Sequence, residues 1–149
     1  MMDISRGLRF YQQFHRFYNR CLTPLMERQQ LSLREIQVLL FLANNPGCDT
    51  ARDVEKLRGL AKSQVSAAVE HLTGRGLLRR LPDQRDRRIV RLSITEAGWP
   101  IAREAQRIQA RCGGALLEGL SREELTQMQG ILEKVLANGE RLAGKESLE

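Results

Sequence analysis

Most of the chain carries apolar residues at helical spacing, and one stretch after residue 76 changes to the alternation of a strand pair. Over residues 4–29, Phe10, Phe14, Phe17 and Cys21 recur on one face of a predicted helix, and a second apolar stripe lies beside them. A helix with so wide an apolar face must be covered on more than one side. Pro24 lacks the N–H donor of the helix ladder, so a kink or break is expected there.

The first predicted helix is also unusually aromatic. Five of the seven aromatic residues of the chain lie within residues 10–18. A cluster this dense indicates packing in a core or dimer interface, or the wall of a small-molecule cavity, and the pattern leaves both interpretations open. If it is a cavity, Phe14, His15 and Tyr18 are the predicted ligand contacts.

Two further helices follow with clear start signals. Ser32 and Glu35 have the spacing of a capping box, and the apolar run over residues 38–43 predicts a helix buried on most sides. The sequence Asn-Asn-Pro-Gly at residues 44–47 ends it. Thr50 caps a short helix predicted over residues 51–58, and Gly59 then turns the chain.

The helix predicted over residues 62–73 has one apolar and one small polar face. Val65, Val69 and Leu72 recur at i, i+4 and i+7, so they face a core. The opposite face carries Ser63 and Ser66 beside other short side chains, so it can approach another macromolecule closely. Two short helices joined by a glycine-containing turn are the helix-turn-helix arrangement.

The pattern then becomes that of a β-hairpin. Gly74 and Gly76 are expected to end the helix, with Gly74 weakening its last half turn. Residues 77–81 and 89–94 alternate as half-buried strands. The turn over residues 82–88 holds three arginines and two aspartates. An isolated basic turn is usually a solvated hairpin tip, but beside a groove-reading helix it favours contact with nucleic acid.

The C-terminal third again reads as helical. Thr95 is expected to cap a fifth helix, and Gly113-Gly114 to bend it. Ser121 and Glu124 form a second capping box that starts a last helix with an apolar stripe. The stripes of the first and the last two helices exceed what one small domain can cover, which indicates association with a second copy.

The positive net charge is concentrated in the middle of the chain. The 149 residues are 42% hydrophobic and 28% charged, which suits one folded domain. Residues 52–91 carry a net charge of +6, whereas residues 1–51 carry +2 and residues 92–149 carry −2. The basic middle is therefore expected to face phosphate. No apolar run reaches 18 residues, so the sequence predicts a soluble, cytoplasmic protein without a membrane partner.

Few residues suggest chemistry. Cys21, Cys48 and Cys112 show no metal-ligand spacing and are expected to be reduced thiols, with Cys48 the most reactive if a thiol switch exists. His15 and His71 look isolated, so no metal site is expected. The sequence has no phosphate-binding loop and no nucleophile elbow, so neither an enzyme nor a bound cofactor is predicted.

Residues 31–98 resemble the winged helix-turn-helix core of the MarR family of bacterial transcription regulators. The most specific match is the wing motif Asp83-x-Arg85-Asp86-x-Arg88, followed by a Thr-x-x-Gly sequence that ends at Gly98. Further matches are Leu31-Ser32 with Gln37 and Leu40, Ser63-Gln64-Val65-Ser66, and Gly76-Leu77-Leu78.

The resemblance implies a mainly α, α+β winged-helix fold in a single MarR-like chain over residues 1–149. Residues 31–98 would form the DNA-binding core, and residues 4–30 and 99–143 a helical dimerisation region. It also implies a homodimeric repressor of a palindromic operator on double-stranded DNA, with release by a small aromatic or phenolic effector. The alternatives are control by cysteine oxidation, or a winged helix that binds protein or RNA.

The expected DNA contacts divide into two kinds. Ser63, Gln64 and Ser66 are placed to meet base edges in the major groove. Lys62, Arg85 and Arg87 suit phosphate contacts. At the wing, Asp86 is close enough in sequence to hold Arg88 in an extended pose, and the family pattern implies that an arginine enters the minor groove.

Overall fold

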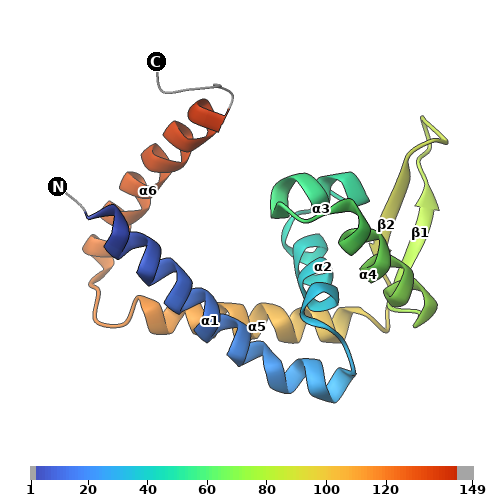
Figure 1. Ribbon diagram of the computed structural model, residues 1–149, viewed down its shortest axis with the longest axis horizontal. Helices are drawn as coiled ribbons and strands as arrows, with labels where there is room; N and C mark the ends of the chain where they lie inside the picture. Colours follow the sequence, from blue (N-terminus) through green and yellow to red (C-terminus); the bar gives the residue numbers. More distant parts are fainter. Residues whose placement is uncertain (1–2, 144–149) are drawn as a thin grey trace. The chain divides into compact units, whose positions relative to one another are not determined.

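The computed structural model describes residues 3–143 and has six helices and two strands within them (Figure 1). The elements follow in the order α1 (Ile4–Gln29), α2 (Leu33–Asn44), α3 (Ala51–Arg58), α4 (Lys62–Gly74), β1 (Leu78–Pro82), β2 (Val90–Ile94), α5 (Trp99–Leu116) and α6 (Arg122–Ala143). The chain divides into two compact units between Cys112 and Gly113. The fold is mainly helical with one small sheet, as predicted.

Helix α2 forms the centre of the first unit. Its residues 35–41 are all buried, and it contacts α1, α3, α4 and β2. The surrounding elements contribute fully buried side chains such as Leu22 from α1, Val54 from α3 and Leu72 from α4. Burial of a leucine or valine side chain contributes about 1.5 to 3 kcal/mol, so this apolar centre holds the helix-turn-helix together.

Local capping explains where the helices begin. The hydroxyl of Ser32 accepts the N–H of Glu35 at 3.3 Å, and the Glu35 carboxylate accepts the N–H of Ser32 at 2.7 Å. Thr50 and Asp53 form the same reciprocal pair before α3. Both caps satisfy N–H groups that the first helical turn leaves unpaired. The capping box predicted at Ser32 and the cap predicted at Thr50 are confirmed.

Helices α1 and α4 both include a residue that was expected to interrupt them. Of the kink or break predicted at Pro24, the break is absent, because α1 is one helix from Ile4 to Gln29. Leu22 and Leu25 beside Pro24 are fully buried, and their packing supports this turn. Helix α4 includes Gly74, since the N–H of Arg75 still bonds to the His71 carbonyl at 3.0 Å. The positive φ that ends this region belongs to Gly76 alone, at 71°.

The junction before α5 also differs from the prediction. Helix α5 begins at Trp99, and Thr95 caps the turn that precedes it rather than the helix itself. The Thr95 hydroxyl accepts the N–H of Gly98 at 3.1 Å and donates to the carbonyl of Gly76 at 2.6 Å. The turn is thereby fastened to the start of the hairpin. Helix α5 then continues through Gly113 and Gly114 to Leu116.

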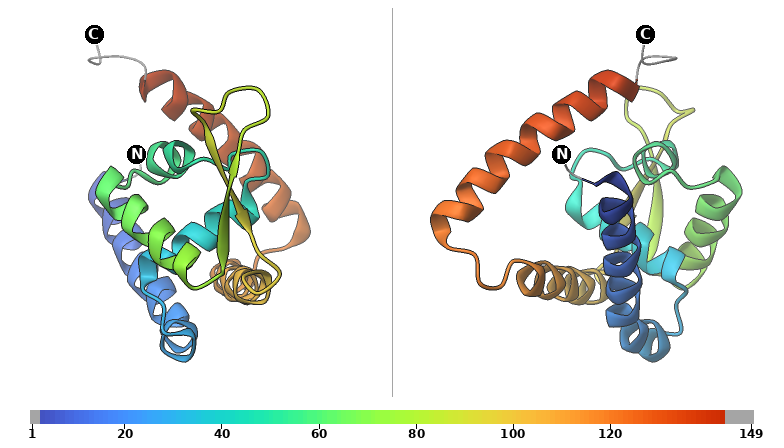
Figure 2. Two further views of the ribbon diagram at one scale, coloured as in Figure 1. Left: turned by 90° about the vertical axis from the view of Figure 1, so that its right-hand side faces the viewer. Right: turned by 60° about the vertical axis from the view of Figure 1, so that its left-hand side comes forward.

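Strands β1 and β2 form the antiparallel hairpin that makes the wing. Leu78 pairs with Ile94 at its base and Pro82 with Val90 near its tip. Leu78, Leu92 and Ile94 are buried, so the base of the hairpin belongs to the core. The tip projects away from the helices of the first unit (Figure 2). A bridge between Thr50 and Arg91 joins the wing to the segment before α3.

Helix α6 is amphipathic but has no buried residue among those described. Its predicted capping box is present, because Ser121 and Glu124 exchange hydrogen bonds of 2.7 and 3.2 Å. Its exposed apolar side chains are Met128, Ile131, Leu132, Val135, Leu136 and Leu142. Among the helices described for residues 3–143, none combines the length and the apolar character needed to cross a membrane.

Candidate nucleic-acid interface

Helix α4 presents one face to the core and the other to solvent. Val65, Ala68, Val69 and Leu72 are buried. The predicted contact residues Lys62, Ser63, Gln64 and Ser66 are exposed together at its N-terminal end. In the free protein the Gln64 side chain accepts the N–H of Ala61 at 3.4 Å, a long contact that a base edge could replace. The face therefore has the form that a groove-reading helix requires.

The wing tip holds the predicted pair of Asp86 and Arg88 in direct contact. The Arg88 Nε and Nη2 atoms donate to the two oxygens of the Asp86 carboxylate at 3.1 and 3.0 Å. Asp86 also accepts the backbone N–H of Arg88 at 3.0 Å. These bonds lower the pKa of Asp86, chiefly through the Arg88 side chain. The Arg88 side chain stays 90% exposed, so the pair fixes the direction of the guanidinium without covering it.

Asp83 orders the loop between the strands. One of its carboxylate oxygens accepts the backbone N–H groups of Arg85 at 2.7 Å and Asp86 at 2.9 Å. The N–H groups of Asp86 and Arg85, followed by the Arg91 side chain, lower the pKa of Asp83 to about 2. The carboxylate is therefore ionised throughout the physiological range and keeps the loop folded back on itself.

Arg91 was not among the residues that the sequence pointed to. Its Nε donates to Asp83 at 2.6 Å, and its Nη1 donates to Asp49 at 2.5 Å. The pattern on β2 showed only an outward-facing arginine, and no local spacing connects residue 91 with residue 49. By contrast, the predicted phosphate contacts Arg85 and Arg87 are exposed and form no ion pair with the described residues.

Helix α4, the candidate recognition helix, is joined to its neighbours at its C-terminal end. His71, which has no potential metal ligand at helical spacing in the sequence, lies 2.5 Å from the carboxylate of Glu35. The pair could not be found from the sequence, because the two residues are 36 positions apart and come together only when α2 packs on α4. Arg75 donates to the carbonyls of Gln29 and Gln30 at 2.7 and 3.0 Å and so ties the end of α4 to the end of α1.

The structure divides the predicted ligand contacts between two environments. His15 is exposed and bonds to Asn19 at 3.2 Å, and Phe14 lies between Phe10 and Phe17, with ring centroids 6.2 and 6.3 Å away. Tyr18 packs against the core, and burial raises the pKa of its hydroxyl. The Tyr18 hydroxyl and the Asn19 side-chain oxygen are buried without a hydrogen-bond partner among the described residues.

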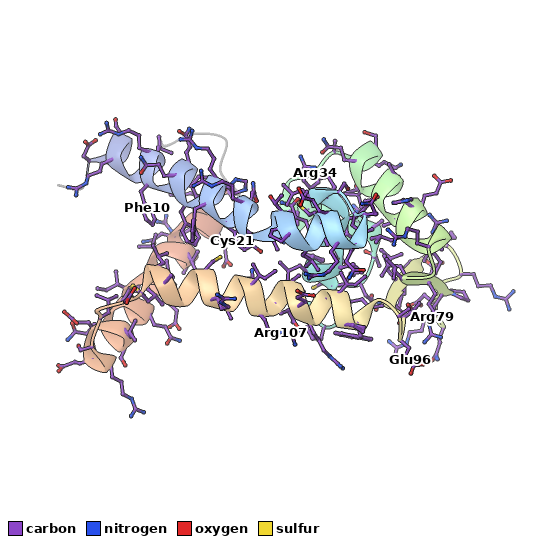
Figure 3. All side chains as sticks on the ribbon, turned by 90° about the horizontal axis from the view of Figure 1, so that it is seen from below. Phe10, Cys21, Arg34, Arg79, Glu96 and Arg107 are labelled. Carbon is purple, nitrogen blue, oxygen red and sulfur yellow. The ribbon has the colours of Figure 1, made fainter. Side chains whose placement is uncertain are left out.

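The cysteines occupy different surroundings. Cys48 is half-buried against the core. Cys112 on α5 is buried, and burial, followed by the neighbouring Cys21 side chain, raises its pKa to about 11. Figure 3 shows Cys21 on the side of α1 that faces α5. Within residues 3–143, His, Cys, Asp and Glu side chains form no group suited to hold a metal ion.

The helix-turn-helix of α3 and α4, completed by the β1–β2 wing, defines a winged helix-turn-helix protein. The model of the MarR family matches residues 29–89, from the end of α1 to the tip of the wing. Over these residues the chain matches the MarR family, whose members are transcriptional regulators and not enzymes.

Similar proteins support this assignment. The uncharacterised HTH-type transcriptional regulator YwaE of Bacillus subtilis (strain 168) is 26% identical over 91% of this chain and 78% of its own length. The crystal structure of the transcriptional regulator PA3341 is 26% identical, with a TM-score of 0.74 over 89% of this chain and 96% of that one. CouR from Rhodococcus jostii RHA1, crystallised with p-coumaroyl-CoA, is 28% identical, with a TM-score of 0.70 over 89% and 91%.

Proposed function

We propose that this protein is a cytoplasmic repressor that binds a palindromic operator as a homodimer, with α4 in the major groove and the wing in the minor groove. The observation that carries this proposal is the Asp86–Arg88 pair, which aims an exposed guanidinium from the wing tip. Narrow A·T-rich minor grooves attract such an arginine through their negative potential. The exposed polar start of α4 and the +6 charge of residues 52–91 fit the same ligand.

We assign two kinds of DNA contact to the N-terminal end of α4 and the wing. Ser63, Gln64 and Ser66 meet base edges, because short or amide side chains at the start of a recognition helix can reach them. Lys62, Arg85 and Arg87 meet phosphates and supply affinity that does not depend on sequence. Arg88 reads groove width rather than base identity.

Dimerisation rests on the apolar surfaces of the helices outside the winged core. Phe10, Tyr11 and Phe17 of α1 are exposed, as is the apolar stripe of α6. Monomeric proteins rarely expose contiguous apolar patches of this kind, and a second copy of the chain would cover them. We therefore assign residues 4–30 and 99–143 to a dimerisation region and residues 31–98 to the DNA-binding core.

An effector site beside Tyr18 is the regulatory part of the proposal. A buried hydroxyl and a buried amide oxygen without partners cost free energy that a polar ligand group could recover. The rings of Phe10, Phe14 and Phe17, on the preceding turns of α1, suit an aromatic or phenolic compound. An effector releases DNA only if it binds the DNA-incompetent arrangement of the two recognition helices more tightly.

Binding to duplexes of defined sequence tests the proposal. A duplex selected by the protein from a random pool is compared with a scrambled duplex of equal composition while the salt concentration rises. A repressor of this kind should bind the selected palindrome as one dimer. Its affinity for the selected duplex should stay higher than that for the scrambled duplex while rising salt weakens non-specific binding. Equal affinity for both duplexes at every salt concentration would instead favour a winged helix that binds protein or RNA.

A further inference from the structure

We propose that Arg91 is a positioning residue for DNA binding. It orients Arg88 at the wing tip through a relay of ion pairs and hydrogen bonds that begins at Asp49. This inference rests on the proposed function, because it concerns how the wing is presented to the minor groove. In the proposed complex Arg91 itself does not touch DNA. It joins the helix-turn-helix to the wing, so that the orientation of the wing relative to α4 is fixed.

The first part of the relay fastens β2 to the segment that precedes α3. The Arg91 Nη1 atom donates to the Asp49 carboxylate at 2.5 Å, and the backbone N–H of Leu92 donates to the Asp49 carbonyl at 2.6 Å. Thr50, which caps α3, forms a bridge with Arg91. The same short segment therefore starts α3 and holds the middle of the wing strand.

The second part runs from Arg91 to the wing tip. The Arg91 Nε donates to one oxygen of Asp83 at 2.6 Å, and the other oxygen of Asp83 accepts the N–H groups of Arg85 and Asp86. Asp86 in turn holds the guanidinium of Arg88. Each link is a charge-assisted hydrogen bond, the stronger class of such bonds. The Arg88 side chain at the tip is thus connected to Asp49 through three ionic residues, Asp86, Asp83 and Arg91.

The charges of the relay argue against a direct DNA contact by Arg91. Two of its nitrogens are already bound to carboxylates, and these bonds with Asp83 and Asp49 raise the pKa of Arg91. Together Asp49, Arg91 and Asp83 carry one net negative charge, which repels phosphate. A negatively charged cluster on a DNA-binding wing weakens DNA binding unless its hydrogen bonds hold a DNA-contacting side chain in place. Asp49, Asp83 and Arg91 are among the residues that line a surface hollow beside the wing.

Asp49→Asn distinguishes positioning from electrostatics by the sign of its effect. The substitution removes one negative charge near DNA, so electrostatics alone predicts tighter binding. The relay predicts weaker binding to a duplex with A·T-rich flanks, by roughly tenfold, the range for one lost hydrogen bond to a charged group. Glu70→Gln is the matched control, because Glu70 is exposed on α4 and forms no ion pair with the described residues.

Arg91→Lys supplies a second variant that keeps the positive charge. A lysine ammonium cannot reproduce the fork that spans Asp83 and Asp49, so the relay predicts a loss similar to that of Asp49→Asn. A phosphate contact by residue 91 would be retained by lysine, with an unchanged salt dependence. Tighter binding by Asp49→Asn together with unchanged binding by Arg91→Lys would overturn the proposal.

Hydrogen exchange of the free protein separates this inference from the proposed function. The amides of Arg85 and Asp86 donate to Asp83 and report whether the wing loop is ordered. Asp49→Asn should speed their exchange several-fold while core amides such as that of Leu39 stay unchanged. If the wild-type protein shows no sequence-dependent binding, the proposed function fails, but faster exchange still supports the relay. Unchanged exchange at Arg85 and Asp86 would overturn the relay whatever the DNA result.

Discussion

The carboxylate of Glu35 at the start of α2 lies 2.5 Å from Nδ1 of His71 in the last turn of the recognition helix. The same carboxylate accepts the N–H of Ser32 at 2.7 Å, so one buried side chain both caps α2 and holds the end of α4. The orientation of the recognition helix is therefore fixed from its C-terminal end, at the opposite end from the predicted base contacts.

Loss of the Glu35 carboxylate should destabilise the fold more than loss of its histidine partner. Glu35→Ala should lower the free energy of unfolding by about 2 to 4 kcal/mol, because it removes a capping bond and leaves two partners unpaired. His71→Ala should cost about 1 kcal/mol, since the half-exposed ring can be replaced by water. Urea unfolding at one fixed protein concentration measures both, and equal losses would contradict a double role for Glu35.

Gly98→Ala should be far more damaging than Gly74→Ala, although both replace a glycine at a helix terminus. A Cβ at position 98 would lie 2.2 Å from the carbonyl oxygen of Leu77, whereas nothing lies within 4 Å of a Cβ at position 74. We expect Gly98→Ala to cost about 2 to 4 kcal/mol through the overpacked junction with the wing. Gly74→Ala should be neutral or stabilising by up to about 1 kcal/mol, because it favours the helix. Thermal unfolding of both variants checks this contrast.

The sequence predicted the elements better than the contacts between them. Helical spacing and the capping signals at Ser32, Thr50 and Ser121 located helix starts, because these signals involve residues only three positions apart. Helix α4 includes Gly74 and α1 does not break at Pro24, since packing on α2 outweighs the local preference of one residue.

Local pattern also explains which parts of the candidate site were found. The Asp86–Arg88 contact spans two residues and was predicted correctly. The partners of Arg91 and His71 are 42 and 36 positions away, so only the folded chain reveals them.

The wing pair makes a prediction about the sign of a charge effect. Asp86→Ala should weaken binding to a duplex with A·T-rich flanks, because Arg88 loses both oxygens that hold it. Arg88→Ala should weaken the same complex by about tenfold or more and lose the preference for A·T-rich flanks. Arg87→Ala should lower the affinity for all duplexes alike and reduce the salt slope by about one unit. Fluorescence anisotropy at two salt concentrations measures these affinities. Tighter binding by Asp86→Ala would rule out the role of Asp86 in holding Arg88.

The apolar stripe of α6 predicts the assembly state. Replacing Ile131 and Val135 together by glutamate should convert the proposed dimer to a monomer, because both side chains are more than half exposed in the single chain and charge would oppose their burial. The matched control replaces Thr126 and Ala137 by glutamate on the other side of the helix. Light scattering at micromolar concentration should show a monomer only for the first pair. A wild-type monomer would remove the basis for palindromic recognition.

Cys112 should be the last thiol to react with iodoacetamide at pH 8. Its side chain is buried and its pKa is raised to about 11, so it is almost entirely protonated at that pH. Because the unfolded thiol ionises near pH 8.5, the stability that Cys112 contributes is full below that pH and is lost as the pH rises toward 11. Mass spectrometry of partially alkylated protein identifies the order, and urea should abolish the protection of Cys112.

Arg75 couples the end of α4 to the end of α1. Its guanidinium holds the carbonyls of Gln29 and Gln30, so a positive charge sits at the negative end of the α1 dipole while its own backbone follows the last turn of α4. When α1 shifts, whether through a bound compound or through its partner across a dimer, the displacement reaches the recognition helix through two hydrogen bonds. In the proposed homodimer, the spacing of the two operator half-sites that the protein can bind then depends in part on Arg75, which lies at the end of α4 opposite the proposed base contacts.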